Sequence, residues 1–135
     1  MTTAHLEILE DQGRPAIDRI RALLDEVVDS EEENRRNGHS GCLTVNTTVE
    51  FAGRDPEIAR LLDRDLSRRL EVLRGVIEVG RHEGGIASAR DPGDLARFVN
   101  AVIAGIRVAA RGGADRTALT AIAATAMDAL TPGSL

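Results

Sequence analysis

Few side chains in this chain have the type and spacing needed for metal or nucleophilic chemistry. His39 and Cys42 lie three residues apart and are both metal-binding types. A structural zinc site needs about four such ligands in tetrahedral geometry, and His5 and His82 supply no second pair at a matching spacing. We therefore predict no metal site and no cofactor. No base is placed to activate the Cys42 thiol, so we interpret this residue as a small buried hydrophobe.

The carboxylates offer no acid–base catalysis either. Asp63 with Asp65, and Glu31 with Glu33, are two positions apart, so the members of each pair point to different faces of a helix. Carboxylates placed in this way do not act together on one substrate. The glycines form isolated helix stops or turn pairs, and none belongs to a phosphate-binding loop. We predict that the chain is not an enzyme.

Charge and composition narrow the classes of partner. The chain has 17 Lys plus Arg against 22 Asp plus Glu, a net charge of -5, whereas binding to nucleic acid needs a clustered positive surface. The acidic run 31–33 is expected to form a solvated helix end. A single cysteine suits a reducing compartment, and the longest apolar stretch, 98–110, is too short to cross a bilayer. We predict a cytoplasmic protein without membrane contact.

Two amides interrupt apolar runs. Asn46 follows the apolar residues after Cys42, and Asn100 lies within the sequence FVNAVIAGI. A buried amide has to find hydrogen-bond partners or a ligand. Each asparagine is therefore either a satisfied amide of the core or an interface, or a polar anchor in an otherwise apolar pocket. Both interpretations stay open for both residues.

The elements that position these side chains are predicted to be helices. Apolar residues recur at spacings of three and four along most of the chain. Asp55 and Asp91, each followed by proline, have the composition of helix N-caps, and Asp115 suits the same role. The predicted helices cover residues 1–12, 15–33, 42–52, 56–83, 91–111 and 115–130, which gives an all-α, antiparallel bundle of about six helices.

The segment 42–52 is the ambiguous one. Its β-branched residues alternate as in a strand, yet Cys42, Val45, Val49 and Ala52 also form a helical stripe. No other stretch alternates, so a lone strand would leave its backbone groups without partners. This argument favours a helix.

The last two predicted helices carry more apolar surface than one chain covers. Residues 91–111 and 115–130 are apolar on more than one face, whereas a helix with one covered side needs only one apolar stripe. We therefore predict a homodimer in which these helices meet their counterparts. The residues expected at the dimer interface are Ala96, Ile103, Ala110, Leu119, Ala123, Ala126 and Met127.

The stretch 41–65 resembles the middle of the ligand-sensing domain of TetR-family transcriptional repressors. It has a Gly-Cys-Leu start, Asn46 and Glu50 four residues apart, and an Asp-Pro-Glu helix start at 55–57, and the resemblance covers most of the chain. It implies an all-helical sensing body with a cavity for a small, largely apolar effector, and an intersubunit four-helix bundle of the last two helices. By position, the residues expected to line the cavity are Val45, Asn46, Val49, Leu62, Leu66, Phe98 and Val102.

The same resemblance implies a division of the chain. Residues 1–12 resemble the end of a helix that joins a DNA-reading head to the sensing body, and residues 13–135 the effector-binding and dimerisation domain. No part of the sequence corresponds to the helix-turn-helix of that head. We expect this polypeptide to reach DNA only through a missing N-terminal domain. The alternative is a ligand-free interaction subunit that forms heterodimers with a full-length regulator.

Overall fold

The computed structural model describes residues 1–38 and 55–132. This part of the chain folds into the helices α1 (Thr3–Glu10), α2 (Ala16–Arg36), α4 (Pro56–Glu83), α5 (Pro92–Arg111) and α6 (Arg116–Leu130), and it contains no strand. The predicted all-helical class is confirmed, with five helices in the described residues. The segment 42–52, for which we predicted a further helix, lies outside them.

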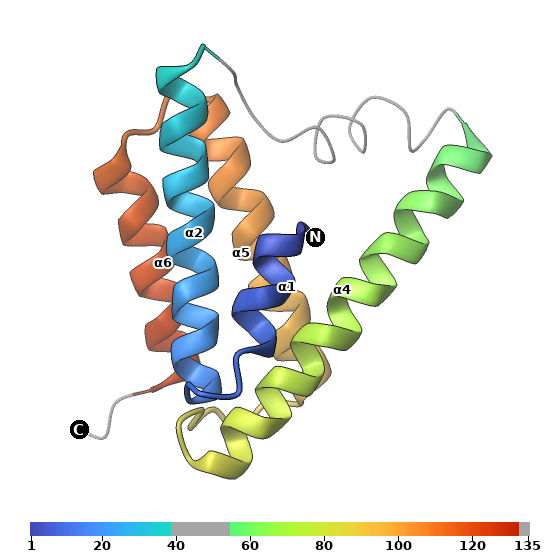
Figure 1. The fold of residues 1–135 in the computed structure, drawn as a ribbon, viewed down its shortest axis with the longest axis vertical. Helices are drawn as coiled ribbons and strands as arrows, with labels where there is room; N and C mark the ends of the chain where they lie inside the picture. The colour runs from blue at the N-terminus through green and yellow to red at the C-terminus, as the bar shows by residue number, and fades with distance from the viewer. Residues whose placement is uncertain (39–54, 133–135) are drawn as a thin grey trace.

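α2 stands at the centre of the helical arrangement. It lies beside α5 and α6 and contacts both of them, as well as α1 and α4 (Figure 1). α4 crosses the bundle diagonally and packs mainly on α5. Its N-terminal half diverges from the other helices, and its buried residues all lie between Leu73 and Gly80. The C-terminal half of α4 therefore anchors this long helix to the bundle.

Four of the five helices begin where a polar side chain caps the backbone. Thr2 and His5 form a capping box at the start of α1. Asp55 and Asp91 accept hydrogen bonds from N–H groups of the first turns of α4 and α5, and Asp115 does the same for α6. Each aspartate satisfies backbone donors that have no partner within the helix. The three predicted aspartate N-caps are confirmed.

α2 is the exception, because no side chain of its own segment caps it. Instead, the backbone N–H of Ala16 donates a hydrogen bond to Oε1 of Glu83, at 2.9 Å. Glu83 is the last residue of α4, so this bond joins the start of one helix to the end of another. A carboxylate at a helix N-terminus is also favoured by the helix dipole.

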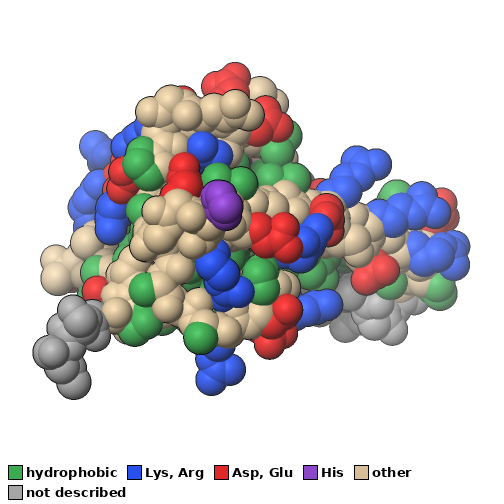
Figure 2. Space-filling view, turned by 90° about the horizontal axis from the view of Figure 1, so that it is seen from below, with side chains coloured by type: hydrophobic (Ala, Val, Ile, Leu, Met, Phe, Trp, Pro, Cys, Tyr) green, Lys and Arg blue, Asp and Glu red, His purple; other side chains and the backbone are tan. Residues whose placement is uncertain are grey.

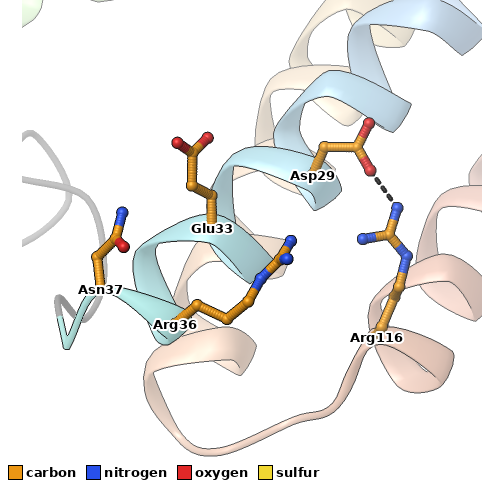
Figure 3. A pocket seen from close by; sticks show the side chains of 5 residues that line it. All are labelled: Asp29, Glu33, Arg36, Asn37 and Arg116. Atoms are coloured by element: carbon orange, nitrogen blue, oxygen red, sulfur yellow. Dashed lines mark hydrogen bonds and ion pairs between the residues drawn. The ribbon is translucent and has the colours of Figure 1, made fainter.

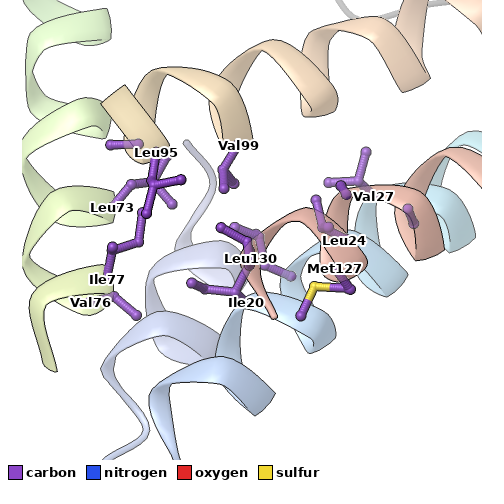
Figure 4. Close-up of a cluster of buried hydrophobic side chains, with 14 of the residues drawn as sticks. Ile20, Leu24, Val27, Leu73, Val76, Ile77, Leu95, Val99, Met127 and Leu130 are labelled. Carbon is purple, nitrogen blue, oxygen red and sulfur yellow. The ribbon is translucent and has the colours of Figure 1, made fainter. Parts of the chain in front are cut away.

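The core of the described residues is aliphatic and receives side chains from every described helix. Figure 4 labels those of α2, α4, α5 and α6. α2 contributes most, because one broad face of it turns inward. The apolar stripes predicted for 15–33 and for the second half of 56–83 are confirmed as core. The fully buried large side chains are Leu9, Ile20, Leu23, Leu24, Val27, Leu73, Ile77, Val99, Ile106, Leu119 and Leu130.

The outer surface mixes charges of both signs. In the view from below, basic and acidic side chains are interspersed and hydrophobic ones form scattered patches (Figure 2). Arg60, Arg64 and Arg68 of α4 are all exposed. Neighbouring ion pairs on the same helix, such as Arg74 with Glu78 at 2.6 Å, fit a solvated face.

The close packing at the end of α4 requires a glycine. The Gly80 carbonyl accepts from the N–H groups of Gly85 and Ile86, which closes the turn around Gly84, a left-handed residue with φ of 86°. A Cβ at Gly80 would lie 2.5 Å from Cδ1 of Ile86 and 3.2 Å from Cβ of Ala16. Ile86 is itself buried and has little room to move.

Gly80→Ala should therefore lower the free energy of unfolding by about 1–3 kcal/mol, the usual cost of overpacking. Gly75→Ala is the matched control, because nothing lies within 4 Å of a Cβ built there. Alanine is the better helix former by about 1 kcal/mol, so this variant should be more stable than the parent. Urea unfolding measures the change in unfolding free energy of both variants. A change of the same sign in both would contradict the packing around Gly80.

Candidate ligand cavity

A buried ion pair joins α2 to α5. Oε1 of Glu31 lies 2.9 Å from Nη1 of Arg107, and the two side chains are 1% and 12% exposed. Our expectation of a solvated end for the acidic run was wrong for Glu31, because the inward face of α2 extends to this residue. The signal in the sequence was Arg107, a permanent charge within the apolar run of α5, which needs a buried counter-charge.

His5 is a second polar side chain in the interior, 7% exposed. Burial lowers its pKa, the positive charge of Arg107 lowers it further, and the α-amino group of Met1 adds to the effect. The imidazole is therefore neutral near neutral pH. Its Nδ1 accepts a hydrogen bond from the backbone N–H of Thr2, at 3.5 Å, so the ring proton is on Nε2.

Arg107 and His5 line a small cavity of about 90 Å³ between α1, α2, α4 and α5. Asn100 is one of the residues that line it, and the side-chain amide of Asn100 forms no hydrogen bond with another described residue. Of the two interpretations given for Asn100, this position favours the pocket anchor. The cavity is lined by Met1, Thr2, His5, Leu23, Arg69, Leu73, Asn100, Ile103 and Arg107.

Arg69 is the least satisfied group of this cavity. Its Nε atom is buried and has no hydrogen-bond partner, and Asp65 lies 3.4 Å from its Nη1. Arg69 and Met1 also line an outer hollow of about 370 Å³ between α1 and α4. Arg69 therefore stands between the inner cavity and the surface. Neither its sequence position nor its neighbours in the chain indicated this role.

A third hollow, of about 500 Å³, lies where α2 ends and α6 begins (Figure 3). Asp29 and Arg116 pair across it, and Glu33, Arg36 and Asn37 complete its walls. All five residues are exposed, and its two acidic side chains match its two basic ones in charge. A ligand here would stay in water without a charge to neutralise, so this hollow is a weaker candidate than the cavity.

Four of the seven predicted effector-binding residues belong to the described part of the chain. Val45, Asn46 and Val49 fall outside the described residues. Leu62 and Leu66 are half-buried on the diverging half of α4, Val102 is half-buried and Phe98 is 38% exposed. None of these four lines the cavity around Asn100, so their role in binding stays a prediction.

Most residues predicted at the dimer interface lie inside the protomer instead. Ala96, Leu119, Ala123, Ala126 and Met127 are buried in its own core, because α2 packs on both α5 and α6. Ile103 and Ala110 are half-buried, and Ile103 lines the cavity. The face that we assigned to a partner is thus mainly a core face, and the positions need correction. The intersubunit contact itself stays a prediction.

The apolar surface that remains open lies on other sides of α5 and α6. On each helix, exposed and half-buried small or apolar residues follow one another at spacings of three and four. Phe98 and Val108 are the largest, at 38% and 53% exposed. We call these two sets the open stripes: Phe98, Ala101, Val102, Gly105, Val108 and Ala109 on α5, and Ala118, Ala121, Ile122, Thr125 and Ala129 on α6.

The described residues thus form an aliphatic helical bundle with a polar cavity and with open stripes on α5 and α6. Residues 16–126 match the family model described as tetracyclin repressor-like, C-terminal domain. The chain therefore belongs to this family, the C-terminal domains of TetR-like transcriptional regulators. Comparisons with curated proteins and with solved structures find no match.

Within residues 1–38 and 55–132, no group of three or more His, Cys, Asp or Glu side chains is placed to hold a metal ion. None of the five helices is long and apolar enough to cross a bilayer.

Loss of the buried carboxylate should destabilise the fold strongly. Glu31→Ala leaves Arg107 buried without a counter-charge, which costs about 3–5 kcal/mol of unfolding free energy. Glu31→Leu combined with Arg107→Met removes both charges and should recover most of that loss. Asp29→Ala, in the exposed pair with Arg116, is the control and should change stability by less than about 1 kcal/mol. Denaturant titration compares them, and equal losses would contradict the buried pair.

Acidification should destabilise the protein through His5. Its pKa is lower in the folded than in the unfolded chain, so the unfolded chain binds the proton more tightly. This contribution to stability is complete above the ordinary pKa of 6.5 and is lost as the pH falls below that value. In His5→Gln the pH dependence of the melting temperature between pH 7.5 and 5 should be shallower. His82→Gln, at an exposed site, should keep the slope of the parent.

Proposed function

We propose that this chain is the effector-sensing and dimerisation body of a TetR-like transcriptional repressor. Two copies would pair through the open stripes of α5 and α6, and a small molecule would bind in the cavity around Asn100. DNA would be reached through a separate N-terminal head, to which α1 would connect. The observation that supports the proposal is the presence of an open stripe on each of the last two helices, α5 and α6.

The composition of the open stripes supports pairing with a second copy. Ala101, Gly105 and Ala121 are small, which allows helices to approach closely. A Cβ built at Gly105 meets nothing within 4 Å, so this part of α5 is unoccupied in the protomer. Stable dimer interfaces are rich in apolar surface at their centre, and Phe98 and Val108 would supply it. A two-fold axis brings each stripe to its own counterpart.

The cavity supports the sensing role. Leu23, Leu73 and Ile103 give it apolar walls, while Asn100 and His5 place polar groups on it, which is the usual design of a small-molecule site. Thr2 and His5 belong to the start of α1. A ligand in the cavity would therefore contact the helix next to the proposed head. A ligand that contacts this helix better in one conformation than in another would shift the equilibrium between the two.

Val108→Glu should convert the dimer into a monomer in sedimentation velocity, because it would bury two like charges in the interface. Leu61→Glu is the matched control, since Leu61 is a similarly exposed apolar residue on α4, and it should leave the dimer unchanged. A Val108→Glu protein that stays fully dimeric, with the melting temperature of the parent, would refute pairing through the open stripes.

A further inference from the structure

The lining of the cavity carries an excess of positive charge. Arg69 and Arg107 both contribute to it, and none of the nine described residues that line it is a carboxylate. Guanidinium groups stay charged at all relevant pH values. Glu31 neutralises part of Arg107 from outside the lining, and Asp65 lies beside Arg69 but is 45% exposed. His5 adds no charge of either sign, because its neutral form is favoured.

Hydrogen-bond donors are also in excess. The Nε–H of Arg69 is buried without an acceptor, and Nε2–H of His5 and the amide of Asn100 have no acceptor among the described residues. Arg107 gives one N–H, from Nη1, to Glu31. Among these cavity donors, only Nε of Arg69 is a buried atom without a hydrogen-bond partner, and a donor left in that state is unfavourable. A carboxylate is the matching group, since it is an acceptor with about four lone-pair sites and it brings negative charge.

The other walls and the volume indicate what the carboxylate is attached to. Leu23 and Leu73 are fully buried, so carbon rather than water is expected next to them. The cavity of about 90 Å³ equals the share of about three water molecules, enough for a head group and its first carbons. Beyond Arg69, Leu6 and Val72 line the outer hollow between α1 and α4. The remaining carbons of a ligand would extend in that direction.

We propose that the effector is an amphipathic monocarboxylate. Its carboxylate binds Arg69 and Arg107, Asn100 and His5 donate further hydrogen bonds to it, and its first carbons contact Leu23, Leu73 and Ile103. The rest of the molecule leaves past Arg69 toward the outer hollow. The inference rests on the proposed function, because it names the chemical class of the effector for that cavity.

The test compares acids with alcohols of the same carbon skeleton. The melting temperature of the whole chain is measured against increasing octanoate, 1-octanol, phenylacetate and 2-phenylethanol at constant ionic strength, with inorganic phosphate as a further probe. Ligand stabilisation grows as RT ln(1 + [L]/Kd). At least one acid should bind ten times more tightly, or better, than its alcohol.

Two variants and one control locate the site. Arg69→Gln and Asn100→Leu should each weaken binding of that acid at least tenfold and change the apparent affinity for its alcohol less than threefold. Both residues are partly exposed, and neither is part of the Glu31–Arg107 pair, so the variants should fold. Arg64→Gln, at an exposed site on the same helix, should leave both affinities unchanged.

Each other outcome overturns the inference in a distinguishable way. Alcohols that bind as tightly as the acids would leave the sensing role intact and remove the anionic anchor. A shift with phosphate alone would indicate an inorganic anion. Acid binding that survives Arg69→Gln would place the carboxylate elsewhere. No shift with any probe would refute this ligand class, whereas the dimer is judged separately by sedimentation.

Discussion

The packing of α2 against four other helices is the constraint on which the rest of the structure depends. Its inward face, from Ile20 to Glu31, contacts α1, α4, α5 and α6 at once. Among the described residues, the hydrophobic core contains no Phe, Tyr or Trp, so its stability has to come from many close aliphatic contacts. The same packing covers the inner sides of α5 and α6, which decides which of their residues stay available to a partner.

The ion pair of Glu31 and Arg107 is a polar interaction within the otherwise aliphatic contact between α2 and α5. Moving two charges out of water is costly, and a buried pair contributes little net stability compared with apolar residues of the same size. It does fix the alignment of α2 with α5, because any sliding would separate the charges. It also keeps a guanidinium at the wall of the cavity near His5 of α1, whose pKa is lowered first by burial and then by the charge of Arg107.

α5 is the element shared by the two proposed activities. At about 100° per residue along a helix, Asn100, Ile103 and Arg107 lie on the side opposite to Phe98 and Gly105. One side of α5 therefore faces the cavity and the other carries an open stripe. A ligand that moves α5 slightly would act on the contact with a second copy, since both use one rigid helix.

The sequence alone determined the helical class and most helix limits, because Asp-Pro starts, glycine stops and apolar spacing are local signals that need no tertiary contact. It also singled out Asn100 as a polar group within an apolar run. Only the tertiary structure decided which apolar face of α5 and α6 is covered, since both faces look alike in sequence until α2 is docked on one. The tertiary structure also brought His5, Arg69 and Arg107, from three different helices, to one cavity, with Glu31 of a fourth helix paired to Arg107 outside its lining. Their proximity depends on contacts between distant parts of the chain, which residue spacing does not encode.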